Sequence, residues 1–213
     1  MTLHFHAQGR LAVEPPVTET SFDEYISDPA RPVPYIDKIG NIMQTELMCA
    51  DQRFASRRPD VLVYETDVLQ KDITLAGPIL ADLHVSTSGT DSDWIVKLID
   101  VYPNDHPDPN PNPTGVRLGG YQQLVRGEVM SGRFRNSFEK PEPFTPGQPA
   151  AIKFKLPDVC HTFQKGHRIM VQVHSSWFPL VDRNPQTFVD KFRAKESDFQ
   201  RATQRVYRSK ERP

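Results

Sequence analysis

The stretch Ile79-Leu80-Ala81-Asp82-Leu83-His84-Val85-Ser86 decides the fold. Apolar side chains fill its odd positions, and mostly polar side chains fill its even positions. Successive side chains of a β-strand point to opposite faces, so a period of two predicts a strand with one face in a core and the other in water. The fold should therefore contain sheets with one solvated side.

Two later stretches repeat this alternation. In residues 152–156 we expect Ile152, Phe154 and Leu156 to point inward and Lys153 and Lys155 to point into solvent. Residues 168–174 give a second set. There, Ile169, Val171 and Val173 are expected inside, and Arg168, Met170, Gln172 and His174 outside.

Residues 94–101 differ because they carry apolar side chains on both faces. Trp94, Val96 and Leu98 share one face, and Ile95, Ile99 and Val101 share the other, although Lys97 and Asp100 interrupt the pattern. A strand that is apolar on both faces is covered on both sides. We expect a sandwich core on one side and another domain on the other.

Turn signals separate these runs. The chain has 20 prolines in 213 residues, and they fall at the ends of apolar runs, where proline cannot interrupt a strand. About eight short strands with turns between them predict an all-β sandwich or barrel. Helical spacing occurs only twice, at Ile42, Met43, Leu47 and Ala50 and, more loosely, at Phe192, Ala194, Phe199 and Ala202.

The N-terminal part has a different organisation. Residues 14–40 contain several residue-proline pairs, which favour extended backbone, and we expect an extended strap held by Phe22, Tyr25 and Tyr35. Residues 1–59 are assigned to this strap and a short helix, and residues 60–213 to the β-sandwich. The two parts should form one structural unit.

Composition excludes several classes of protein. The chain has 26 basic and 27 acidic residues, a net charge of −1, which provides no field for nucleic acid. No apolar run is long enough to span a membrane. Cys49 and Cys160 are too few for a disulfide framework or a zinc site. Small buried thiols are the expectation for them, with a single disulfide as the alternative.

The motifs of catalysis are missing from the sequence. There is no G-x-S-x-G nucleophile elbow and no phosphate-binding glycine loop, so we assign no catalytic, cofactor-binding or metal-binding residue. The proline-rich segment 102–113 contains Asp105, His106 and Asp108, which could suggest a metal site. A solvated surface loop is the better interpretation, because rigid prolines keep the carboxylates apart and no glycine provides a sharp turn.

One stretch contains more hydroxyl, aromatic and charged side chains than a strand requires: His174-Ser-Ser-Trp-Phe-Pro-Leu-Val-Asp-Arg-Asn-Pro. Aromatic residues beside an arginine favour an interface or a pocket edge. The alternative is a structural corner in which Asp182 and Asn184 bond backbone amides and Arg183 pairs with a carboxylate. The residues alone leave both interpretations open.

Together with the preceding run Lys165-Gly-His-Arg-Ile-Met-Val-Gln-Val, this stretch resembles the C-terminal domain of the X-prolyl dipeptidyl peptidase family of serine hydrolases. That family includes cocaine esterase, α-amino acid ester hydrolases and glutaryl-7-aminocephalosporanic acid acylases. Further similar motifs follow in the same order along the chain. They are Phe22-Asp-Glu-Tyr-Ile-Ser-Asp-Pro-Ala-Arg-Pro, Asp51-Gln-Arg-Phe-Ala-Ser-Arg-Arg-Pro, Leu75-Ala-Gly-Pro and Asp91-Ser-Asp-Trp-Ile-Val-Lys-Leu-Ile-Asp-Val-Tyr-Pro.

The resemblance implies a jelly-roll, galactose-binding-like β-sandwich without a catalytic centre. Its Ser-His-Asp triad would lie on an α/β-hydrolase domain before Met1, and the sandwich would pack on that domain and its helical cap beside the active site. The compartment, whether periplasmic, secreted or cytoplasmic, would depend on sequence before Met1. Relatives continue beyond Arg212 and Pro213 into a final strand, which implies an open sheet edge here.

Candidate contacts with those domains, or with a pocket edge, are Trp94, Trp177, Phe178, Asp182, Arg183 and Asn184. The exposed second face of residues 94–101 and the corner at Trp177 and Phe178 would carry the contact. A carbohydrate-binding module and a module for homo-oligomerisation are the alternative functions, because jelly rolls often bind saccharides.

Overall fold

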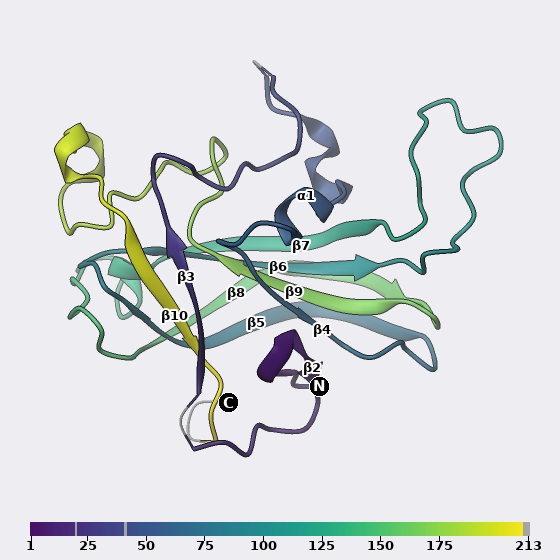
Figure 1. Cartoon of the computed structure of the whole chain (residues 1–213), viewed down its shortest axis with the longest axis horizontal. Coiled ribbons are helices and arrows are strands. Elements are labelled where there is room, and N and C mark those ends of the chain that lie inside the picture. The colour runs from purple at the N-terminus through teal and green to yellow at the C-terminus, as the bar shows by residue number, and fades with distance from the viewer. Residues whose placement is uncertain (20, 41, 211–213) are drawn as a thin grey trace.

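A computed structural model describes residues 1–19, 21–40 and 42–210. Two four-stranded sheets stack face to face, and a small two-stranded sheet lies beside them (Figure 1). The strand order is β3-β10-β5-β8 in one sheet and β4-β9-β6-β7 in the other, and every pairing within them is antiparallel. The predicted all-β sandwich is confirmed.

The chain crosses repeatedly between the two sheets. Successive strands from β3 to β10 change sheet at every step except between β6 and β7, which is the jelly-roll arrangement of eight strands. The strands are β1 His4–Phe5, β2 Leu11–Ala12, β3 Phe22–Ser27, β4 Leu62–Glu65, β5 Ile73–Thr87, β6 Asp93–Val101, β7 Gln122–Ser131, β8 Ala150–Phe163, β9 Arg168–His174 and β10 Ala202–Tyr207.

The main core fills the space between the two sheets, as the alternation predicts. Leu83 of β5 lies opposite Ile152 of β8, and both are buried. Their neighbours Asp82 and Lys153 form an ion pair on the solvent side. Because the inward positions interdigitate with Trp94 of the facing sheet, the apolar periods of two fix the inner face of each strand.

Two expectations about the outer face of the sheet β4-β9-β6-β7 are wrong. We expected another domain over β6 and solvent over Met170, Gln172 and His174 of β9, but these three side chains are completely buried. The cover comes from the chain itself. Residues 33–40 and 42–56 cross this face and are hereafter called the strap, in place of the segment 14–40 to which the sequence assigned that name. With the sheet they form a second core from Tyr35, Ile36, Leu47, Ala50, Ile95, Ile99, Leu124, Met170 and Trp177.

The helices are shorter than the helical spacing suggested. Within the strap, the first predicted helix becomes a 3-10 helix η2 at Thr45–Cys49, followed by one turn of α-helix, α1, at Arg53–Ser56. The C-terminal helix is wrong. Only the 3-10 turns η4, Lys191–Arg193, and η5, Glu196–Asp198, form before β10, because segments this short cannot sustain α-helical hydrogen bonding without an apolar face to bury. The remaining 3-10 turns are η1, Ala7–Gly9, and η3, Gly132–Phe134.

The proline-rich loop is mostly exposed, and so are the two cysteines. Asp108 holds the proline-rich loop by accepting hydrogen bonds from Leu118 N, at 2.8 Å, and from Arg117. Cys49 and Cys160 are both free and exposed, so the expectation of buried thiols is wrong: Cys160 lies on the outward side of β8, beside inward-facing Val159. The implied continuation at Arg212 and Pro213 lies outside the described residues.

Candidate docking surface

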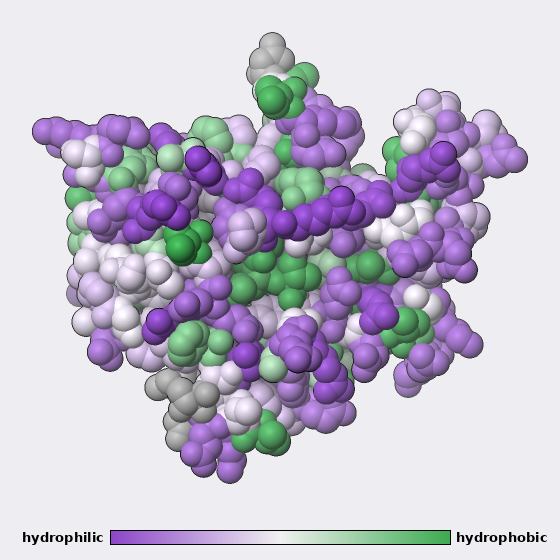
Figure 2. All heavy atoms as spheres, viewed as in Figure 1, coloured by the Kyte–Doolittle hydropathy of each residue, from purple (hydrophilic) through white to green (hydrophobic). Residues whose placement is uncertain are grey.

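The strap exposes a cluster of large apolar side chains. Ile39, Ile42, Met43 and Met48, hereafter the strap patch, are all more than half exposed. The segment that carries them, residues 38–40 and 42–49, projects from the sandwich above α1 (Figure 1), and apolar atoms lie near the tip of this projection (Figure 2). Exposed apolar side chains that cluster in this way mark interaction surfaces more often than isolated ones do.

A shallow groove of about 320 Å³ adjoins the strap patch. Its apolar walls come from Pro34, Ile36, Ile39 and Phe54, and Arg58 lies at its edge. Arg58 forms a bidentate ion pair with Asp60 and also donates to the carbonyl of Arg31. Arg58 therefore joins the segment just before the strap, at Arg31, to the segment just after it, at Asp60.

Backbone hydrogen bonds hold both ends of the strap in place. At its start, Tyr35 N donates to Phe178 O and Phe178 N donates to Val33 O, at 2.9 and 3.0 Å. At its end, Gln52 N donates to Gln122 O of β7 at 2.8 Å. The exposed apolar side chains are thus presented on a segment that is hydrogen-bonded at both ends.

The predicted site residues separate into buried and accessible groups. Trp94 lies wholly inside the main core and Trp177 lies under the strap, with only 6% of its surface exposed. Neither side chain is accessible to another domain in this structure. Phe178 is exposed beside the strap, Asp182 is exposed, and Arg183 is half-buried.

The corner at Asn184 is structural. Asn184 Oδ1 accepts a hydrogen bond from Gln186 N at 2.7 Å, and its Nδ2 donates to Asp91 Oδ2 and Asp93 Oδ1 at 3.1 and 2.9 Å. Arg183 does not form the expected carboxylate pair among these contacts. It donates to the carbonyl of Pro29, and its guanidinium lies over the ring of Phe199.

A buried charge network surrounds Asn184. Arg133 donates to Asp91 Oδ2 through Nε at 2.9 Å and through Nη2 at 2.5 Å. Lys191 Nζ donates to both oxygens of Asp93. Burial raises the pKa of Asp91, although its hydrogen bonds and charge pairing with Arg133 oppose that rise. These contacts join the β5–β6 connection, η3 and the C-terminal segment.

A second polar cluster lies under the strap. The sequence signalled it only through Lys97, which breaks the apolar pattern of residues 94–101. Lys97 is completely buried, and its Nζ donates to Gln52 Oε1 at 3.0 Å. The amine lies 4.9 Å from the centre of the Trp177 ring. Burial lowers the pKa of Lys97 to about 7. It also lowers the pKa of His174, which is buried in the same layer and feels the charge of Lys97.

The side chains of His6, His161, His167 and His174 bond aspartate or backbone carbonyl oxygens and not a serine hydroxyl. His161 Nε2 and His167 Nδ1 bond the two oxygens of Asp100, at 2.9 and 2.8 Å. His6 and His174 bond the carbonyls of Glu14 and Ser176. Across residues 1–19, 21–40 and 42–210, no group of three acidic, histidine or cysteine side chains could hold a metal ion.

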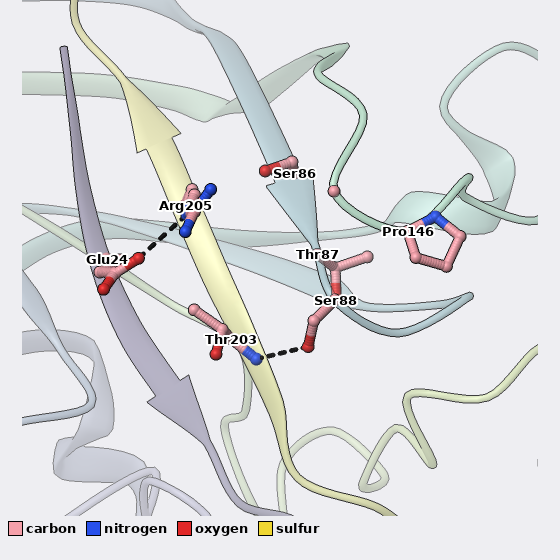
Figure 3. A pocket seen from close by; sticks show the side chains of 8 residues that line it. Glu24, Ser86, Thr87, Ser88, Pro146, Thr203 and Arg205 are labelled. Carbon is pink, nitrogen blue, oxygen red and sulfur yellow. Dashed lines mark hydrogen bonds and ion pairs between the residues drawn. The ribbon is translucent and has the colours of Figure 1, made fainter.

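A polar groove of about 340 Å³ lies on the other sheet, between β10, the end of β5 and the loop at Pro146 (Figure 3). Ser88 Oγ accepts a hydrogen bond from Thr203 N, and Glu24 forms an ion pair with Arg205. The residues that line the groove include no histidine or lysine, and its carboxylate, Glu24, is paired with Arg205, so the lining offers its hydroxyl groups no free base for activation.

The sequence profile of the X-Pro dipeptidyl-peptidase C-terminal non-catalytic domain matches residues 2–213. Cocaine esterase from Rhodococcus sp. (strain MB1 Bresler) is 33% identical over 205 residues, which cover 96% of this chain and 33% of the esterase. No helix within the described ranges is long and apolar enough to cross a membrane.

Two solved structures agree closely with the fold. An α-amino acid ester hydrolase is 48% identical with a TM-score of 0.91, and the match covers 99% of this chain and 34% of that one. An aminopeptidase from a marine sediment archaeon, Thaumarchaeota archaeon, is 44% identical with a TM-score of 0.90, covering 99% and 35%. The chain thus spans about a third of the length of these relatives.

Proposed function

Because the chain belongs to the family of X-Pro dipeptidyl-peptidase C-terminal non-catalytic domains, we propose that its strap patch packs on an α/β-hydrolase domain and its cap in the same polypeptide. The exposed apolar side chains on a doubly anchored strap carry this proposal. About two thirds of each relative lies outside the matched region, which leaves room for such domains.

The chemistry of the patch suits an intramolecular partner. Ile39, Ile42 and Met43 would each lose exposed apolar surface on docking, and burial of such surface stabilises contact by about 25 cal/mol per Å². Phe178 and Asp182 lie at the accessible side of the same corner, at the edge of the contact. The sandwich would then border the active site while supplying no catalytic group.

The activity of the whole protein follows as part of the proposal. We infer a serine hydrolase that acts on esters or amides with an acyl or aminoacyl part, as the names of the relatives suggest. Its histidine would activate the serine, and its aspartate would orient the histidine, all on polypeptide outside this chain.

A chimera tests the docking proposal. This chain replaces the matched C-terminal third of the α-amino acid ester hydrolase, and we expect a folded chimera that hydrolyses an α-amino acid ester. The double substitution Ile42→Ser and Met43→Ser should lower its activity or the fraction of domains docked by roughly fivefold or more, because two apolar contacts are lost. Ester hydrolysis and thermal unfolding measure the two effects.

The matched control is Leu80→Ser. Leu80 is 61% exposed on β5, on the sheet that faces away from the strap, so its loss should leave the chimera unchanged. Equal activity and unfolding behaviour for the strap-patch variant and the control would refute docking through the patch.

We propose a second candidate function, saccharide binding, on the basis of the polar groove on the other sheet. Hydroxyl groups of Ser88 and Thr203 lie beside the Glu24–Arg205 pair (Figure 3), and such groups can bond neutral polyols. Titration with neutral saccharides should shift the backbone amide resonances of Ser88 and Thr203, and Glu24→Gln should weaken the response. Unchanged spectra at saturating saccharide would exclude this function for the groove.

A further inference from the structure

The layer beneath the strap contains ionisable groups that the docking proposal does not use. Lys97 projects from the middle of β6 and is enclosed by Gly127 of β7, Gln172 of β9, Trp177 and Gln52. Gln52 belongs to the strap, and its side chain accepts the hydrogen bond of the Lys97 amine. The strap therefore separates this amine from water.

His174 lies two residues beyond Gln172 on the same face of β9. Its Nδ1 bonds the carbonyl of Ser176 at 2.7 Å, so the neutral ring donates there and leaves Nε2 as an acceptor. His174 Nε2 and Gln172 Oε1 have no hydrogen-bond partner within the described chain. A protonated His174 would place a second cation in this closed layer.

Within the part of the chain that the structure describes, no carboxylate forms a hydrogen bond or ion pair with Lys97 or His174. Arg58, whose charge acts on His174, is paired with Asp60, and Arg53 of α1 is paired with Asp51. Glu65 of β4 interacts with Arg168, and Lys38 pairs with Glu46 on the strap. Arg126 and Glu128 of β7 alternate with Gly127, so they point to the opposite face from Lys97.

We propose that the strap is a latch over the sheet β4-β9-β6-β7, and that protonation of Lys97 and His174 loosens it. Opening the strap would admit water to both groups and let them hold their protons as they do in solvent. A closed strap disfavours those protons, because two cations would be buried without a counter-ion.

The direction of the effect follows from proton uptake on opening. Lys97 has a pKa of about 7 when buried and about 10.5 when solvated, so lowering the pH from 10.5 to 7 increasingly favours the open strap. His174 adds to this below its ordinary pKa of about 6.5. The strap should be firmly closed near pH 9 and looser near pH 6.5.

Hydrogen exchange of the 213-residue chain tests the latch without any docking partner. Mass spectrometry at pH 6.5 and 9 gives exchange rates, which are divided by the intrinsic rate at each pH. We expect protection of the amides of Gln52, Ala55 and Ser56 to be roughly 10- to 100-fold lower at pH 6.5 than at pH 9. Amides in the centres of β5 and β8 report global unfolding in the same sample.

The variant Lys97→Met isolates the lysine, since methionine fills similar space without titrating, and it should remove most of the change between pH 7 and 9. Three results would overturn the latch: strap protection constant within twofold in the unmodified chain, strap amides as strongly protected at pH 6.5 as the amides in the centres of β5 and β8, or a full pH response in the folded variant. The first two require no variant. The latch regulates the proposed docking surface, but exchange in the isolated chain remains informative even if the chimera shows no docking.

Discussion

Arg133→Met is expected to destabilise the protein by about 3–5 kcal/mol, the range for breaking a buried ion pair by removing one partner. Asp91 is completely buried, and Arg133 makes two hydrogen bonds to its Oδ2. The other oxygen, Oδ1, has no partner within the described chain. The substitution would leave Asp91 with only the amide of Asn184, so its charge would be poorly compensated. Chemical denaturation measures the loss.

Two further variants test whether the unpaired, buried charge of Asp91 causes the loss of stability. The double variant Arg133→Met with Asp91→Asn should recover part of the stability, because a neutral amide is less costly to bury than an unpaired carboxylate. Arg193→Met removes a pair with Asp190 in which the side chains are 88% and 56% exposed, and it should change stability by less than about 0.5 kcal/mol. Similar losses for Arg133→Met and Arg193→Met would show that burial does not determine the contribution of the pair.

Lys97→Met is expected to remove a pH dependence of global stability. The folded-state pKa of Lys97 is about 7, below its unfolded value of 10.5, so the unfolded chain binds more protons between these pH values. Stability of the unmodified protein should therefore rise with pH in this window, by about 2 kcal/mol from pH 7 to pH 9. Below pH 7 both states hold the proton, and the contribution of Lys97 becomes constant.

The change of unfolding free energy with pH is a better measurement than the unfolding free energy at one pH. Methionine leaves the buried oxygen of Gln52 without its donor, a penalty of about 1–3 kcal/mol that offsets the gain from removing a buried amine. Denaturant midpoints at pH 7, 8 and 9 should increase for the unmodified protein and remain level for the variant. Parallel slopes would mean that Lys97 keeps an ordinary pKa when folded.

The residues that we propose for docking were only partly predictable. The aromatic and polar stretch at 174–185 drew attention to Phe178 and Asp182, which are exposed, but also to Trp177 and Asn184, which are buried. Interface composition and core composition share aromatic residues, so residue type alone cannot separate them. The exposed apolar side chains at Ile39, Ile42 and Met43 were missed because helical spacing suggested that part of this set was buried.

The sequence by itself determined the strands and, in β5 and β8, which side chains face the core, because a period of two has only one arrangement that buries its apolar half. Its ordered motifs also identified the family. Tertiary structure alone decided what covers the outer face of β6 and β9, since two apolar faces show that a strand is enclosed without showing what encloses it. The partners there are distant in the chain: Lys97 bonds Gln52, 45 residues earlier, and Asn184 bonds Asp91, 93 residues earlier. Such contacts form only when the sheets stack and the strap closes over them, and no local pattern records them.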